Sequence, residues 1–140
     1  MTYATKQNMI DRYAEQLLIE LTDRVDPALN VINDTVLNGA LADADALINS
    51  FIGRRYDLPL ASTPPVLTQP AAAITFYTLH RGRHSDETRK AFEDAMAFLA
   101  DLSSGKAVLD VGGTEPQSAP AQAVSDASDR TFTRDKLKGF

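Results

Sequence analysis

The stretch from residue 33 to residue 60 constrains the fold most, because it combines a long amphipathic pattern with a basic, proline-containing end. Asn33 or Asp34 can cap the start, since either side chain can accept a backbone N–H of the first turn. Apolar residues recur every three or four positions, at Val36, Leu37, Ala40, Leu41, Ala44, Leu47, Ile48, Phe51 and Ile52. This helical period indicates one helix with a broad apolar stripe, and we expect it to be the long central helix of the fold.

The end of this helix forms a segment that we call the hook, residues 54–60, with the sequence Arg-Arg-Tyr-Asp-Leu-Pro-Leu. Arg54 and Arg55 place positive charge at the negative end of the helix dipole. Pro59 pushes the residue before it toward extended geometry, so the chain must leave the helix here. Two interpretations stay open: Arg54, Arg55 and Tyr56 form a binding surface, or Tyr56 packs internally while an arginine caps carbonyl groups.

Four further helical patterns surround the long one. Thr5 can cap a helix through Tyr13, with Tyr3 packing back on Met9, and a second short helix follows over residues 15–21. A helix over about 66–81 contains Pro70, so either this proline kinks the helix or the helix proper starts near Thr68; a kink or an irregular first turn is the preferred interpretation. The last helix starts at Ser85, with Gly105 as its left-handed cap.

Together these patterns predict an all-α fold, a small bundle of four to five helices with an extended C-terminal arm. Weak alternation near residues 106–111 indicates a short strand. In the connector before the long helix, Val31 and Ile32 are expected to tuck beneath it.

Composition changes at Gly112, which divides the chain into three parts. Residues 1–111 carry the helical domain. Residues 112–129 are rich in Gly, Pro, Ser, Ala and Gln, a composition typical of a flexible linker. Residues 130–140 restore apolar and basic side chains, so we expect a docking arm anchored by Phe132, Leu137 and Phe140, which grips its own domain, a neighbouring subunit or a partner.

Bulk properties narrow the class of protein. The chain has 140 residues, no cysteine and a formal net charge of −5, which excludes disulfides and argues against a surface that binds nucleic acid as a whole. The first residues have no apolar run of the kind found in a signal peptide, and no stretch approaches the roughly 20 apolar residues of a membrane span. We expect a soluble protein made in a cytoplasm, without membrane contact.

No catalytic constellation stands out, so an enzyme and a cofactor are not expected. His80 and His84 have a spacing that can bind zinc, but a glycine lies between them and no third ligand is evident. Asp43 and Asp45 lie two apart, which on a helix points them in different directions and indicates a solvated face. No serine lies in a G-x-S-x-G nucleophile turn.

Two basic clusters remain as candidate binding surfaces. One comprises Arg81, Arg83, Arg89 and Lys90, and the other Arg130, Arg134, Lys136 and Lys138. Each could contact DNA phosphates or pair with acidic groups of a neighbouring protein. Because the chain is acidic overall, charge pairing at an interface is the preferred interpretation.

Short motifs follow one another in a set order along the chain: Tyr3-Ala-Thr, Met9-Ile-x-Arg-Tyr13, Leu41-Ala-Asp-Ala-Asp45, Ile48, Arg55-Tyr-x-Leu-Pro-Leu60, Tyr77-x-Leu79, Arg89-Lys90, Phe92, Ala95, Phe98-Leu99, Gly105-Lys106 and Arg130-x-Phe-Thr-Arg-Asp-x-Leu137. This ordered set resembles the phage Mu-like protein family found in Mu-type phages and prophages, whose members are similar to head–tail connector, or adaptor, proteins of long-tailed phages. The resemblance covers nearly the whole chain outside the linker. Pro70 departs from the pattern, because the resemblance implies a regular helix there.

The resemblance implies a structural virion protein that assembles as a ring of twelve copies in the neck, beneath the portal, after synthesis in the host cytoplasm. Such a ring would contact the portal and a stopper or tail-completion protein, and DNA would pass through it without sequence-specific binding. Arg54, Arg55, Tyr56, Arg130, Phe132, Arg134, Leu137 and Phe140 would then be interface candidates. The alternative from another class is a DNA-binding or DNA-packaging accessory protein that uses the basic clusters at 81–90 and 130–138.

Overall fold

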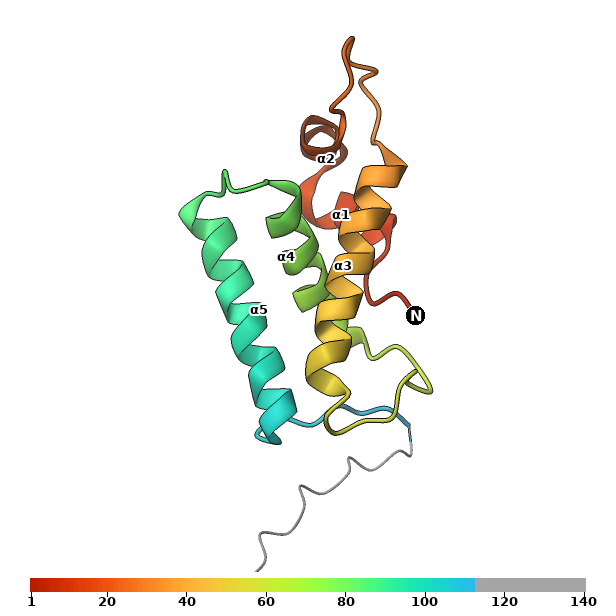
Figure 1. Cartoon of the computed structure of the whole chain (residues 1–140), viewed down its shortest axis with the longest axis vertical. Helices are drawn as coiled ribbons and strands as arrows, with labels where there is room; N and C mark the ends of the chain where they lie inside the picture. The colour runs from red at the N-terminus through yellow and green to blue at the C-terminus, as the bar shows by residue number, and fades with distance from the viewer. Residues whose placement is uncertain (113–140) are drawn as a thin grey trace, which may run out of the picture.

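The computed structural model describes residues 1–112, and within them it is all-α, as predicted (Figure 1). Helices α1 and α2 pack on each other at the upper end of the bundle, where α1 contacts α4 and α2 contacts α3, while α5 flanks α4 on its other side (Figure 1). No helix in the described part is long and apolar enough to cross a membrane. The elements are α1 Lys6–Tyr13, α2 Glu15–Thr22, α3 Asp34–Ile52, the 3₁₀ turn η1 Pro65–Leu67, α4 Thr68–Leu79 and α5 Asp86–Ser104.

The long helix predicted from residue 33 onward is α3. Asn33 caps it by accepting the Val36 backbone N–H at 3.2 Å, one of the first-turn donors that lack a partner inside the helix. The predicted stripe faces the core, with Val36, Leu47 and Phe51 at its half-buried edges. The buried residues of the stripe are Leu37, Ala40, Leu41, Ala44, Ile48 and Ile52.

The helix that the others enclose is α4. It has almost no polar face, and a helix that is apolar on all sides belongs inside a protein. Ala71, Ala72 and Ala73 are buried, and such small side chains allow neighbouring helices to approach closely. Both α3 and α5 pack against α4, so it forms the centre of the bundle.

The first turn of α4 shows how Pro70 is accommodated. Pro65 opens η1 and α4 begins at Thr68, so Pro70 is the third residue of α4. A backbone N–H at that position would have no acceptor inside the helix, and proline therefore removes nothing there. The alternative start near Thr68 is confirmed, and the preferred irregular first turn takes the form of the separate 3₁₀ turn η1. The helix ends at Leu79, before the predicted 81, because Arg81 and Gly82 have left-handed φ values of 50° and 89°.

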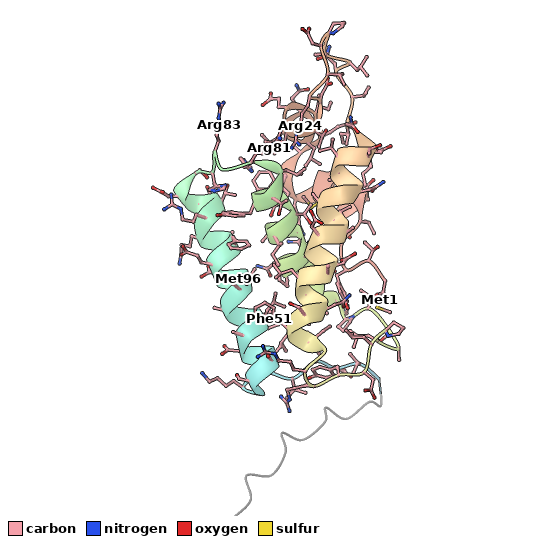
Figure 2. All side chains as sticks on the ribbon, viewed as in Figure 1. Met1, Arg24, Phe51, Arg81, Arg83 and Met96 are labelled. Carbon is pink, nitrogen blue, oxygen red and sulfur yellow. The ribbon has the colours of Figure 1, made fainter. Side chains whose placement is uncertain are left out.

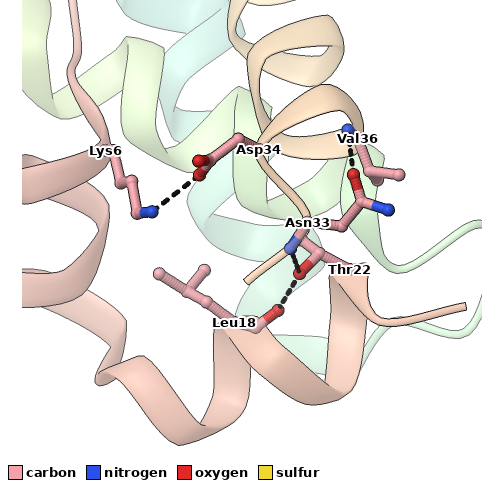
Figure 3. A network of polar contacts seen from close by, with 6 residues as sticks. All are labelled: Lys6, Leu18, Thr22, Asn33, Asp34 and Val36. Atoms are coloured by element: carbon pink, nitrogen blue, oxygen red, sulfur yellow. Dashed lines mark hydrogen bonds and ion pairs between the residues drawn. The ribbon is translucent and has the colours of Figure 1, made fainter. Parts of the chain in front are cut away.

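The two N-terminal helices are separated by a single residue, Ala14, whose φ of 67° lies in the left-handed region. Thr5 caps α1 in a reciprocal arrangement with Asn8. The end of α2 joins α3 through Thr22, which is fully buried. Its hydroxyl donates to the Leu18 carbonyl at 2.7 Å and accepts the Asn33 backbone N–H at 3.0 Å (Figure 3). This pair of hydrogen bonds fixes where the connector meets the long helix.

Tyr3 is buried in the same core cluster as Met9, and it corrects the expected solvated position of Asp45. Its backbone N–H donates to Asp45 Oδ1 at 3.0 Å and its hydroxyl to Asn49 Oδ1 at 2.5 Å, so its polar groups bond to α3. Asp45 is thus half-buried under the N-terminal segment, whereas Asp43 is exposed as expected. Asp45 and Asn49 lie four apart, a spacing that aligns two side chains on one helix face.

The predicted strand near residues 106–111 is wrong. Gly105 caps α5 in the left-handed conformation, as predicted, and the chain then runs irregularly beneath the end of α3 (Figure 1). Alternation arises because Leu109 and Val111 are buried while Val108 and Asp110 are exposed. A ladder needs a second strand, and none is present in residues 1–112. In the connector, Ile32 tucks inward as expected, but Val31 is exposed.

Candidate functional surfaces

The hook is attached to the end of the described chain through Tyr56. The Tyr56 side chain is 4% exposed, and its hydroxyl accepts the buried Leu109 backbone N–H at 2.8 Å. Burial of the ring and pairing of the hydroxyl give Tyr56 an internal structural role in this domain. Arg54 is exposed, so it is the basic side chain that the hook presents to solvent.

Arg55 is half-buried, in contrast to the exposed Arg54 and the buried Tyr56. Its side chain is half-buried against Gly105, where an added Cβ would lie 2.5 Å from Arg55 Nη1. Gly105 therefore has two reasons to be glycine: its φ of 85° and the guanidinium that crosses it. Arg55 Nη1 is buried without a hydrogen-bond partner in the described part of the chain. The guanidinium thus closes the junction between the hook and the end of α5.

A basic cluster occupies the opposite end of the bundle. Arg81 and Arg83 extend from the α4–α5 turn, and Arg24 from the residues after α2 approaches them (Figure 2). Arg24 donates to the Leu21 and Leu79 carbonyls, each at 3.2 Å. Partial burial, and then the like charge of Arg81, lower the pKa of Arg24. Within residues 1–112 none of these three arginines takes part in an ion pair with a carboxylate.

The other two members of the predicted cluster behave differently. Arg89 pairs with Asp86 at 3.4 Å and Lys90 with Asp94 at 3.6 Å, both within α5 and both exposed. Such pairs contribute little to stability. The structure therefore splits the predicted group: Arg81 and Arg83 join Arg24, while Arg89 and Lys90 form local pairs. Arg24 was missed because 57 residues separate it from Arg81, and no local pattern reports that proximity.

The two histidines pack on different aromatic rings. His80 Nδ1 bonds the Phe76 carbonyl at 2.7 Å, and its ring meets Phe76 edge-on. The His84 ring stacks on Tyr77 with centroids 4.0 Å apart, and its Nδ1 is buried without a hydrogen-bond partner. No group of three or more His, Cys, Asp or Glu side chains able to hold a metal ion occurs in residues 1–112.

A groove lined by both apolar and polar side chains follows α4 on the side bounded by α1 and α5. It consists of two adjoining hollows of about 400 and 420 Å³ that share Arg12, Tyr13, Ala73 and Ala91. The Tyr13 and Phe76 rings stack with centroids 3.8 Å apart in one wall. We call this the α4 groove. The remaining lining residues are Leu17, Val66, Gln69, Pro70, Phe76, His80, Ser85, Glu87, Thr88, Asp94, Ala95 and Phe98.

The C-terminal predictions lie beyond this region. The linker after Gly112 and the arm residues Arg130, Phe132, Arg134, Leu137 and Phe140 lie outside the described residues, as do Lys136 and Lys138. Their roles stay predictions from the sequence.

The described part is thus a small helical domain with a basic end, a hook and the α4 groove. Comparison with known proteins places this arrangement in a family. Residues 3–127 match the family described as Bacteriophage Mu, Gp36, and the chain belongs to that family.

Two curated relatives agree with the assignment. The chain is 30% identical over 139 residues to the Mu-like prophage FluMu protein gp36 of Haemophilus influenzae, covering 99% of this chain and 97% of that protein. It is 28% identical over 144 residues to gene product J of Escherichia phage Mu, covering 100% and 99%. Together the matches indicate a structural, virion-related phage protein.

Proposed function

We propose that this protein is a head–tail connector, an adaptor that forms a ring of twelve copies beneath the portal and joins the capsid to the tail. The observation that carries the proposal is the family match, which runs over residues 3–127 and includes the linker as well as the helical domain. The portal and a stopper or tail-completion protein are the proposed partners. The proposed location is the virion neck, reached from the host cytoplasm during assembly.

The surfaces of the domain suit a part that holds several neighbours at once. The basic cluster lies at one end of the bundle, the hook with Arg54 at the other, and the α4 groove between them. Each surface offers a different chemistry, which a ring subunit needs because it contacts two identical neighbours and the components on either side.

Deletion of the gene from an inducible prophage tests the proposal. Electron microscopy of the lysate should show DNA-filled heads and complete tails that are not joined, and the gene supplied on a plasmid should restore whole particles. Normal particles in the deletion strain would contradict the connector role. Empty heads with normal tails would instead favour a role in DNA packaging.

A second function has one observation in its favour. Arg24, Arg81 and Arg83 gather without a carboxylate partner in the described region, and guanidinium groups are good partners for phosphate. A DNA-binding or packaging accessory protein would use this cluster together with the basic residues at 130–138. It would bind duplex DNA with an affinity that falls steeply with salt, and Arg81→Ala with Arg83→Ala would flatten that slope by about two counterions.

A further inference from the structure

The α4 groove is a partly apolar surface that the described chain leaves uncovered. Its floor and walls come from α1, the start of α2, α4 and α5, and no residue of α3 or of the hook lines it. Val66 at one end is 50% exposed, although such a side chain is often buried. From Gln69 to His80 the groove follows α4 for roughly 17 Å, at 1.5 Å per residue.

The segment that fits this groove best is residues 130–140. It holds three large apolar side chains, Phe132, Leu137 and Phe140, with four Lys or Arg and one Asp between them. Residues 1–112 carry 10 Lys or Arg against 15 Asp or Glu, so the charges of segment and domain are opposite. Glu87 and Asp94 lie in the groove itself, where the single cation is Arg12. Apolar anchors with basic neighbours therefore match a groove that offers both apolar side chains and two carboxylates.

The described chain ends away from the α4 groove. Leu109 is fixed to the hook by Tyr56, and the segment after α5 runs beneath the end of α3 (Figure 1). The groove is formed by other helices, so the segment that would bind and the groove that would receive it lie at different places on one molecule. The 17 residues from 113 to 129 can span up to about 60 Å, which is enough to reach an adjacent subunit.

We infer that residues 130–140 of one copy occupy the α4 groove of a second copy, and that this contact links subunits head to tail. A contact between two different patches repeats from subunit to subunit and makes a closed ring when the rotation closes. The inference deepens the proposed connector function, on which the choice of a second copy as acceptor rests.

Three full-length variants test the contact. The first, Phe132→Ala with Leu137→Ala and Phe140→Ala, removes the anchors and changes no residue of the described domain. In the second, Ala91→Arg fills the groove from an exposed position on α5 that lines both hollows. The third, Ala97→Arg, is a matched control, because Ala97 is exposed on the same helix and does not line the groove. Circular dichroism checks that each variant is folded.

Sedimentation velocity from micromolar to millimolar concentration gives the readout. The wild type and Ala97→Arg should associate as concentration rises, while the anchor variant and Ala91→Arg should associate at least about tenfold more weakly. A mixture of the anchor variant and Ala91→Arg tests the head-to-tail contact directly. Because the anchor variant retains its groove and Ala91→Arg retains its anchors, the mixture should form a two-chain complex and stop there.

Several results would overturn the inference. The inference fails if the anchor variant associates as strongly as the wild type. It also fails if the wild type stays monomeric, including the case in which residues 130–140 bind the groove of their own chain. Loss of association in Leu29→Asp alone would assign the interface to the exposed loop before α3. If the contact fails while the deletion strain still yields unjoined heads and tails, the connector role stands without it. If the contact holds while that strain makes normal particles, the connector role fails.

Discussion

The Tyr56 hydroxyl accepts the backbone N–H of Leu109 at 2.8 Å, across 53 residues of sequence and inside the core. Both residues are nearly inaccessible, at 4% and 3% exposed. This single hydrogen bond attaches the segment after α5 to the hook after α3. The described chain therefore ends on the hook side of the bundle. The hook is therefore a structural joint as well as a carrier of Arg54.

Tyr56→Phe should destabilise the domain, because it leaves a buried N–H without an acceptor. We expect a loss of about 1–3 kcal/mol in the free energy of unfolding, measured by urea titration. Tyr77→Phe is the matched control, since Tyr77 is half-buried and its hydroxyl forms no hydrogen bond within residues 1–112. Equal effects of the two substitutions would contradict the role assigned to the Tyr56 hydroxyl.

Gly105→Ala should also destabilise the domain. An alanine at a φ of 85° loses about 1–2 kcal/mol through backbone strain, and its Cβ would press on the Arg55 guanidinium. Gly82→Ala meets the same strain at a φ of 89° with no atom within 4 Å, so it isolates the strain. Because Arg55 is flexible at its far end, we expect the two substitutions to differ by no more than about 0.5 kcal/mol. Thermal and urea unfolding measure both, and an unchanged stability in either variant would argue against the left-handed caps.

Thr22→Val should cost about 1–3 kcal/mol, because the Asn33 N–H loses its acceptor at the start of α3. Thr75→Val makes the same change at an equally buried site. There the hydroxyl only donates to the Ala71 carbonyl within α4, so we expect a loss below about 1 kcal/mol. Urea unfolding of the two variants side by side provides the measurement. A Thr75 variant that is the less stable of the pair would refute the role given to Thr22.

Asp45→Asn should change how stability depends on pH. Burial raises the pKa of Asp45, against the opposing effects of hydrogen bonds from Tyr3 and Thr2 and of the N-terminal charge. A carboxyl group with a raised pKa holds its proton more tightly in the folded state. Its contribution is therefore present at pH values below its ordinary 3.8 and is lost as pH rises through the raised value.

The stability of the wild type relative to Asp45→Asn should accordingly fall as the pH rises from below 3.8 through the raised pKa of Asp45. Other carboxylates titrate in both proteins and cancel in the difference. Urea unfolding at several pH values gives the result, with Asp43→Asn as a control at an exposed position of the same helix. A difference that is constant, or that rises with pH, would contradict the buried position of Asp45.

Local patterns in the sequence predicted much of the fold. The stripe of α3, the caps at Thr5, Asn33, Ser85 and Gly105, and the irregular start of α4 all follow from side chains within a few residues of each other. The false strand at 106–111 has a physical cause. Alternating burial of Leu109 and Val111 resembles a strand, whether or not a neighbouring strand is available for pairing.

The candidate surfaces were harder to predict because they depend on tertiary packing. Arg24 meets Arg81 only after α2 and α4 have packed, and the α4 groove exists only between helices distant in sequence. The sequence left two interpretations of Tyr56 open, a binding surface or internal packing, and its hydrogen bond with the Leu109 N–H supports internal packing. The family, by contrast, was accessible from ordered short motifs, because such motifs record ancestry directly and do not require the packing to be known.

A ring component of the virion neck must be present in finished particles in a fixed ratio to the portal. Quantitative mass spectrometry of purified particles, with isotope-labelled peptides from this chain and from the portal protein, measures that ratio. We expect one copy of this chain for each portal subunit, twelve in a particle. Absence of the chain from purified particles, or a number unrelated to that of the portal subunits, would contradict it.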